Sequence, residues 1–66
     1  MILLTKIDGS EILINERLIE AAYETPDTII LMNTGHTYIV TETLKDIIQK
    51  TSDFRRLTRR RPDKAN

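Results

Sequence analysis

The spacing of apolar residues changes once along this chain, and that change limits the possible folds more than any other feature. Before Val40, apolar residues occur in short runs or at every second position, and from Leu44 onward they follow helical spacing. Alternation is typical of half-buried strands, whereas spacings of three and four residues are typical of an amphipathic helix. The sequence therefore predicts an α+β, mainly β fold in which an antiparallel meander precedes one C-terminal amphipathic helix.

Turn-forming residues divide the part of the chain before the helix into five predicted strands. Asp8-Gly9 is a two-residue hairpin turn, and Asn33-Thr34-Gly35 closes a second hairpin with glycine at a position of positive φ. Thr25-Pro26-Asp27 is also typical of a turn. Asn15 offers an N-cap-like side chain, and residues 15–18 are interpreted as a single helical turn or a bend. The predicted strands are residues 2–7, 10–14, 19–24, 28–32 and 37–40.

Two of these strands carry predictions about burial. In the third, Ile19, Ala21 and Tyr23 alternate with other residues and are expected on one buried face. The fourth, residues 28–32, begins with a threonine and continues as an apolar run, so we expect a central strand that is buried on both faces. One side of such a strand can meet the apolar stripe of the helix. The other side needs a cover from closure of the sheet into a barrel, from Ile12 and Ile14, or from a second copy of the chain.

The predicted helix begins near Leu44 and ends before Pro62. Thr41 or Thr43 can cap this helix, and Thr43 and Asp46 have the spacing of a weak variant of the capping box. Proline disfavours the helical conformation of the residue before it. Phe54 and Leu57 are expected to be the last apolar anchors of this helix on the core. Its apolar stripe consists of Leu44, Ile47, Ile48, Phe54 and Leu57, with Thr51 filling the gap.

The length of the chain limits its stability, because it has 66 residues and no cysteine. A folded domain of this size buries only about 60% of the surface that its unfolded chain exposes, so its fold is marginally stable. No disulfide can add to that stability. We therefore expect a single domain over residues 1–61, a disordered tail over residues 62–66 and association between copies of the chain.

Charge is distributed unevenly along the chain. Residues 1–54 carry four basic and nine acidic side chains, and residues 55–66 carry six basic and one acidic, so a body of charge −5 precedes a tail of charge +5. Such a tail indicates nucleic acid, anionic lipid or an acidic protein surface as a partner. A solvated helix end with cations that interact favourably with the helix dipole explains the same residues. The candidate partner-binding residues are Arg55, Arg56, Arg59, Arg60 and Arg61.

Catalysis is not expected, and neither is a cofactor or a metal. His36 is the single histidine and lies beside a glycine turn, without a second metal-ligand pattern. Glu16, Glu20 and Glu24 are interpreted as a solvated face, because acid–base catalysis needs a pocket and so short a chain leaves little room for one of about 300 Å³.

The location expected from the sequence is cytoplasmic. No apolar run approaches the roughly 20 residues of a transmembrane helix. The first residues also lack the basic segment and the longer apolar segment of a signal peptide.

An ordered set of short segments over residues 1–57 resembles the small FlbD/SwrD-type flagellar proteins. The set consists of Met1 to Thr5, Asp8-Gly9, Asn15, Leu18-Ile19-Glu20, Thr25-Pro26-Asp27-Thr28, Asn33, Gly35, Tyr38-Ile39-Val40, Glu42 and Phe54-Arg55-Arg56. This resemblance implies a cytoplasmic accessory of flagellar motility that supports swarming by raising motor output, with no catalytic residues. An additional residue in the turn at Gly35 and a longer Arg-rich tail depart from the family pattern, so the resemblance implies no role for the tail.

Two functions follow from these observations. The first is a non-enzymatic protein that associates with itself and contacts a flagellar motor or basal-body protein at the cytoplasmic face of the motor. The second is a small nucleic-acid-binding regulator that uses the Arg-rich C-terminal helix. The second is less favoured because the chain has only three aromatic residues and no pattern of stacking platforms in a basic groove.

Overall fold

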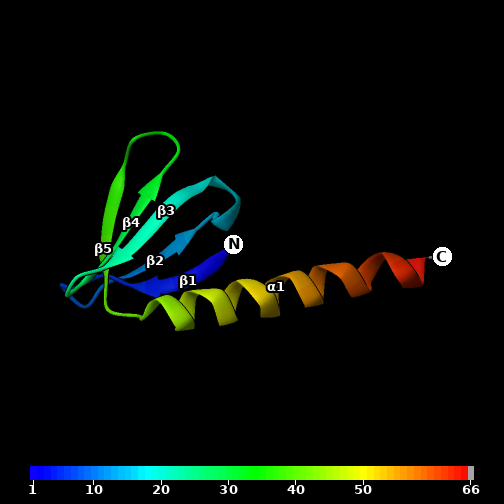
Figure 1. Cartoon of the computed structure of the whole chain (residues 1–66). Coiled ribbons are helices and arrows are strands. Elements are labelled where there is room, and N and C mark those ends of the chain that lie inside the picture. The colour runs from blue at the N-terminus through cyan, green and yellow to red at the C-terminus, as the bar shows by residue number, and fades with distance from the viewer. Residues whose placement is uncertain (66) are drawn as a thin grey trace.

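Two small antiparallel sheets and one long helix make up the structure (Figure 1). This computed structural model describes the backbone of residues 1–65 and the side chains of residues 1–58. Its elements confirm the predicted α+β, mainly β fold class. In chain order they are β1 (Ile2–Thr5), β2 (Glu11–Ile14), the 3-10 helix η1 (Glu16–Leu18), β3 (Ile19–Glu24), β4 (Thr28–Met32), β5 (Thr37–Val40) and α1 (Leu44–Ala65).

The strands do not form one continuous meander, and the described residues contain no closed barrel. One sheet has the order β1-β2 and the other β3-β4-β5, with no pairing between β2 and β3. The two sheets meet at one corner, where Lys6 forms an isolated antiparallel bridge with Val40. The interruption lies at η1, where the Asn15 side chain accepts a hydrogen bond from the Arg17 N–H at 3.1 Å. This predicted helical turn is therefore confirmed, and it separates the strands that a continuous meander would pair.

Both hairpin glycines have the positive φ that the sequence predicts, 95° for Gly9 and 97° for Gly35. The predicted two-residue turn at Asp8-Gly9 is wrong, because the Lys6 N–H donates to the Ser10 carbonyl at 2.8 Å and residues 7–9 form a three-residue loop. The Gly9 N–H donates to the Lys6 carbonyl and the Gly35 N–H donates to the Met32 carbonyl, each at 2.9 Å. A Cβ atom at either position would meet nothing within 4 Å. The requirement for glycine is therefore conformational and does not arise from crowding.

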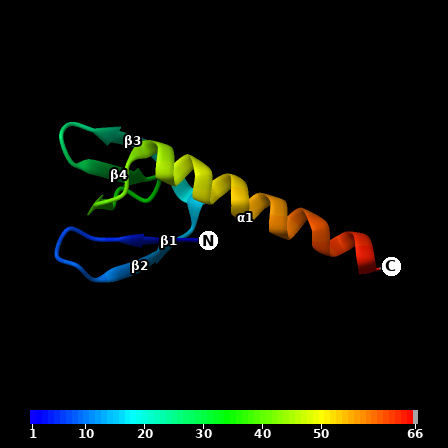
Figure 2. The same ribbon diagram turned by 90° about the horizontal axis from the view of Figure 1, so that it is seen from below.

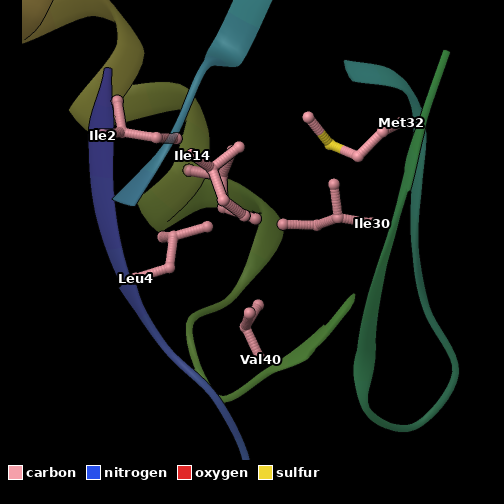
Figure 3. Packing of buried hydrophobic residues seen from close by; sticks show 7 residues of the cluster. Ile2, Leu4, Ile14, Ile30, Met32 and Val40 are labelled. Carbon is pink, nitrogen blue, oxygen red and sulfur yellow. The ribbon is translucent and has the colours of Figure 1, made fainter. Parts of the chain in front are cut away.

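The core lies between the two sheets and the first turns of α1 (Figure 3). Strand pairing places Ile2 opposite Ile14 and Leu4 opposite Ile12, so one face of the β1-β2 hairpin is apolar and points inward. The buried apolar side chains are Ile2, Leu4, Ile14, Ile30, Met32, Val40 and Ile47.

Strand β4 is buried on one face only, so the predicted burial of both faces is wrong. Thr28, Ile30 and Met32 are buried, while Ile29 and Leu31 on the opposite face are only half-buried. The reason is that α1 and the β1-β2 hairpin pack against the same side of the second sheet. No described element covers its other side, which we call the outer face.

A bulge in β3 changes which side chains of that strand face the core. The pairing register with β4 shifts between Ile19 and Ala21. Because one additional residue moves the following side chains to the opposite face, Ile19 and Ala22 pack against the core. Tyr23, which was predicted to share the buried face with Ile19, is 53% exposed.

Helix α1 begins at Leu44 as predicted but does not end before Pro62. The capping box is confirmed, since the Asp46 N–H donates to the Thr43 Oγ1 and the Thr43 N–H donates to the Asp46 Oδ2, both at 3.1 Å. The backbone stays helical to Ala65. Proline removes one backbone hydrogen bond, and water can hydrate the released carbonyl at this exposed end of the helix. The domain boundary at residue 61 stays a prediction.

Candidate interaction surface

The N-terminal end of α1 is fixed to both sheets by hydrogen bonds to carboxylates. The Leu44 N–H donates to the Glu24 Oε1 at 3.0 Å, which joins the helix to the end of β3. The Thr5 N–H donates to both carboxylate oxygens of Glu42, at 2.9 and 3.0 Å. The Thr41 N–H also donates to the Thr5 carbonyl at 2.8 Å. Because these contacts hold the base of the helix to β1 and β3, the sheets fix its direction.

The C-terminal half of α1 extends beyond both sheets (Figures 1 and 2). The molecule measures 45 × 22 × 19 Å along its principal axes as a result. Among the described side chains of the helix, Phe54 is the last that packs against the core. Leu57 is 61% exposed, so its predicted role as an anchor is wrong. The reason is that α1 has already left the sheets at this position.

The five candidate arginines do not form one uniform surface. The Arg56 Nη2 lies 2.7 Å from the Asp53 Oδ1 in an ion pair along the helix. The neighbouring Arg55 forms no ion pair among the described side chains and lines two clefts that flank the helix. The side chains of Arg59, Arg60 and Arg61 lie outside the described part of the structure.

The two clefts exist because α1 is narrow and crosses the sheets on one side, which leaves a depression along each flank. We call them the η1 cleft, of about 340 Å³, and the β3 cleft, of about 450 Å³. Both clefts are open depressions of the surface and not enclosed pockets. The η1 cleft is lined by Met1, Asn15, Glu16, Arg17, Phe54, Arg55 and Thr58. The β3 cleft is lined by Ile19, Ile47, Ile48, Thr51, Ser52 and Arg55.

Glu16 is the carboxylate of the η1 cleft, and it is neutralised within the chain. Its side chain is only 4% exposed and its Oε1 lies 2.6 Å from the Met1 ammonium. The hydrogen bond from this ammonium lowers the pKa of Glu16 below its ordinary value, against the opposing effect of burial. The cations of the cleft that form no ion pair within the described residues are Arg17 and Arg55.

The three glutamates interpreted as one solvated face have separate roles. Glu16 is buried against Met1, Glu24 binds the first turn of α1, and Glu20 is exposed. The interpretation is therefore correct for Glu20 and wrong for Glu16. His36 lies at the end of its predicted turn, where its Nδ1 is 3.0 Å from the Thr34 Oγ1.

Substitution of Glu42 tests the attachment of the helix base. Burial raises the pKa of Glu42. The hydrogen bonds that its carboxylate accepts, led by the one from the Thr5 N–H, together lower the pKa by more, so it lies below the ordinary value of 4.5. A carboxylate with a lowered folded-state pKa stabilises the fold above its unfolded-state pKa, and that contribution disappears as the pH falls through the folded-state pKa. We expect Glu42→Gln to cost on the order of 1 kcal/mol at neutral pH and to reduce the loss of stability below about pH 4.5.

Urea unfolding of both chains between about pH 7 and about pH 3 measures this difference. Glu11→Gln is the matched control, because Glu11 is exposed at the start of β2 and accepts no described side-chain hydrogen bond. An identical pH dependence for the native chain and Glu42→Gln would contradict the prediction.

No group of three or more metal-binding side chains is placed to hold an ion within the described residues. Among the helical segments that the structure describes, none has both the length and the apolar composition needed to cross a membrane.

Comparison with known families identifies the family of this chain. Residues 1–58 match the family model FlbD, described as flagellar and swarming motility proteins. The chain belongs to the FlbD family. The match includes all five strands and α1 up to Thr58, and it leaves out Arg59, Arg60 and Arg61. No curated protein and no solved structure matches the chain.

Membership of the FlbD family confirms the resemblance seen in the sequence and connects the chain with flagellar and swarming motility. The family is described by this role in motility and not by a catalysed reaction. Sequence reasoning identified Arg55 as a candidate, but it did not identify Arg17 or the pairing of Glu16. The nearest signal was Asn15, whose cap places both residues in η1.

Proposed function

We propose that this FlbD-family chain is a non-enzymatic accessory of the flagellar motor that supports swarming by raising motor output through protein contacts at the cytoplasmic face of the motor. Family membership supports the motility role. The observation that carries the interaction role is the projecting half of α1, whose base is fixed to both sheets by Glu24 and Glu42. A helix held in this way carries its C-terminal half beyond the sheets, where a partner can reach it.

The side chains that line the two clefts are also better suited to binding a partner than to acid–base catalysis. The β3 cleft is lined by apolar and hydroxyl side chains with Arg55. In the η1 cleft, the carboxylate of Glu16 is paired with an ammonium and has a lowered pKa, whereas a general acid or base works best with a pKa near the operating pH.

Deletion of the gene, with restoration by the native chain, tests the proposed function. The measurements are swarm expansion, the number of filaments per cell and the rotation speed of tethered cells under high load. We expect the deletion to reduce swarming and rotation speed while the number of filaments stays unchanged. Unchanged rotation with fewer filaments would indicate a role in assembly and would contradict the effect on motor output, and unchanged swarming would contradict the motility role.

The outer face of the second sheet supports an additional contact, with a second copy of the chain. Strand register places Tyr23, Ile29 and Ile39 opposite one another across this face. Ile7 lies beside them, since its N–H donates to the Ile39 carbonyl at 3.2 Å, and Ile7, Tyr23 and Ile39 are exposed. We propose that two copies stack through this apolar face, because these residues carry no charge and no described element covers them.

Sedimentation at increasing protein concentration tests the oligomer. We expect the native chain to form a dimer or a larger species at high micromolar concentration and Ile39→Lys to sediment as a monomer, with Asp27→Lys in the β3–β4 turn as the control. A native monomer under these conditions would contradict the proposal. An oligomer that dissociates in high salt would instead indicate docking of the basic tail on the acidic body of a neighbouring copy, because salt screens exposed charges.

A further inference from the structure

We infer that the η1 cleft is a binding site for an acidic segment of a partner protein, in which a carboxylate lies between Arg17 and Arg55 and an adjacent apolar side chain contacts Phe54. This inference rests on the proposed function and names the chemistry of its partner. The η1 cleft is formed where η1 and α1 approach each other, and each of these elements contributes one arginine to its lining.

The two guanidinium groups are the cations that remain for a ligand in this cleft. Neither Arg17 nor Arg55 forms an ion pair among the described side chains. The Met1 ammonium, in contrast, is already occupied by the buried carboxylate of Glu16. Guanidinium groups bind carboxylates through two parallel hydrogen bonds, which makes an arginine pair well suited to an acidic side chain.

Two other polar groups of the η1 cleft form hydrogen bonds within the chain. The Asn15 side-chain oxygen accepts from the Arg17 N–H, and the Thr58 hydroxyl donates to the carbonyls of Phe54 and Arg55 at 3.2 and 3.0 Å. The half-buried ring of Phe54 adds an apolar surface. A ligand that satisfies both features carries a carboxylate next to an apolar group, as an acidic peptide with aliphatic residues does.

The acidic residues of a second copy fit this cleft less well than a separate partner does. Most acidic side chains of residues 1–54 already accept hydrogen bonds or ion pairs within their own chain. These are Asp8, Glu16, Glu24, Glu42, Asp46 and Asp53. The remaining three, Glu11, Glu20 and Asp27, lie in β2, in β3 and in the turn after β3, so they form no acidic run. We therefore assign the acidic segment to a separate protein.

Binding of a synthetic peptide of alternating glutamate and leucine tests the inference. Titration of the isotopically labelled chain is followed through the side-chain N–H signals of its arginines. We expect the signals of Arg17 and Arg55 to shift and the signal of Arg56 to stay in place. Because a hydrogen bond to a charged group contributes about 1.5–3 kcal/mol, Arg17→Gln and Arg55→Gln should each weaken binding by roughly tenfold or more.

Arg56→Gln is the matched control, because it removes the same charge from the adjacent helix position but acts on a residue that is paired with Asp53. Equal weakening by Arg55→Gln and Arg56→Gln would show diffuse charge attraction and would overturn the site. Tighter binding of a single-stranded oligonucleotide than of the peptide, through the same arginines, would overturn the protein partner in favour of a phosphate ligand. Melting curves of all variants establish that each is folded.

The outcomes separate this inference from the proposed function. If the peptide does not bind but gene deletion still lowers rotation speed, the binding site in the η1 cleft is refuted and the proposed motor role remains. If the peptide binds as expected but the deletion strain swarms normally, the motor role is refuted and the cleft remains. Loss of both peptide binding and swarming in Arg55→Gln, with peptide binding retained by Arg56→Gln, supports both.

Discussion

Leu4→Ala is expected to leave most of the chain unfolded at 25 °C. Leu4 has no exposed surface and lies in the centre of β1, where it pairs with Ile12 and packs with Ile30 and Val40 in the same core. Truncation of a buried leucine to alanine costs about 3 kcal/mol through lost burial and the cavity that remains. A domain of this size has a small free energy of unfolding, so we expect Leu4→Ala to remove nearly all of it.

Leu3→Ala is the matched control for this result. It makes the same chemical change at the adjacent position of β1, but Leu3 is 47% exposed on the opposite face of the strand. We expect it to cost less than about 1 kcal/mol. Circular dichroism during heating and urea titration measures both variants. Similar melting midpoints for Leu3→Ala and Leu4→Ala would contradict the placement of Leu4 in the core.

The correctly predicted parts of the fold are local. The positive φ of Gly9 and Gly35 follows from the turns that they close. The cap formed by Thr43 and Asp46 is equally local. These features depend on residues that are close together in sequence, so the sequence alone predicted them correctly.

The wrong predictions concern features that depend on contacts between segments far apart in sequence. The bulge that exposes Tyr23 is set by the register of β3 against β4, and nothing within β3 signals it. The one-sided burial of β4 depends on which face of the sheet α1 covers. The predicted end of α1 before Pro62 is wrong because the helix continues to Ala65, in the half that extends beyond both sheets.

For the candidate interaction surface too, local features were predictable and contacts between distant segments were not. Helical spacing predicted that the arginines follow the end of α1, and Asp53 three residues before Arg56 is a recognisable helical ion pair. The presence of Arg17 and Arg55 in the lining of one cleft was not predictable in this way, because η1 and α1 are far apart in sequence. The pairing of Glu16 with Met1 likewise joins two elements that no local pattern connects.

Reversal of the candidate arginines is expected to abolish swarming while the body of the protein remains folded. Replacement of Arg55, Arg56, Arg59, Arg60 and Arg61 by glutamate changes the charge of residues 55–66 from +5 to −5. All five positions follow Phe54, the last described helix residue that packs against the core. Single surface substitutions usually change stability by less than about 0.5 kcal/mol. Anions near a helix C-terminus are unfavourable, and this effect is confined to the last turn.

Swarm expansion and rotation speed are measured beside the melting midpoint of the purified variant. Loss of swarming with a folded body indicates that these arginines bind a partner. Full swarming by the folded, expressed variant would instead favour a solvated helix end, whose charge serves solubility and complements the helix dipole. Replacement of the same five residues by lysine keeps the charge but removes the guanidinium groups, so it separates a need for positive charge from a need for arginine.

Partial reversals locate the effect along the helix. Arg55→Glu alone changes the residue that lines both clefts, whereas reversal of Arg59, Arg60 and Arg61 leaves Arg55 and its pocket contacts unchanged. If Arg55→Glu abolishes swarming and the triple reversal has a small effect, the partner binds at the base of the projecting half. If the triple reversal is the more damaging, the partner contacts the end of the helix, beyond the residues that match the FlbD family. The departure from the family pattern would then be the part of this chain that selects its partner.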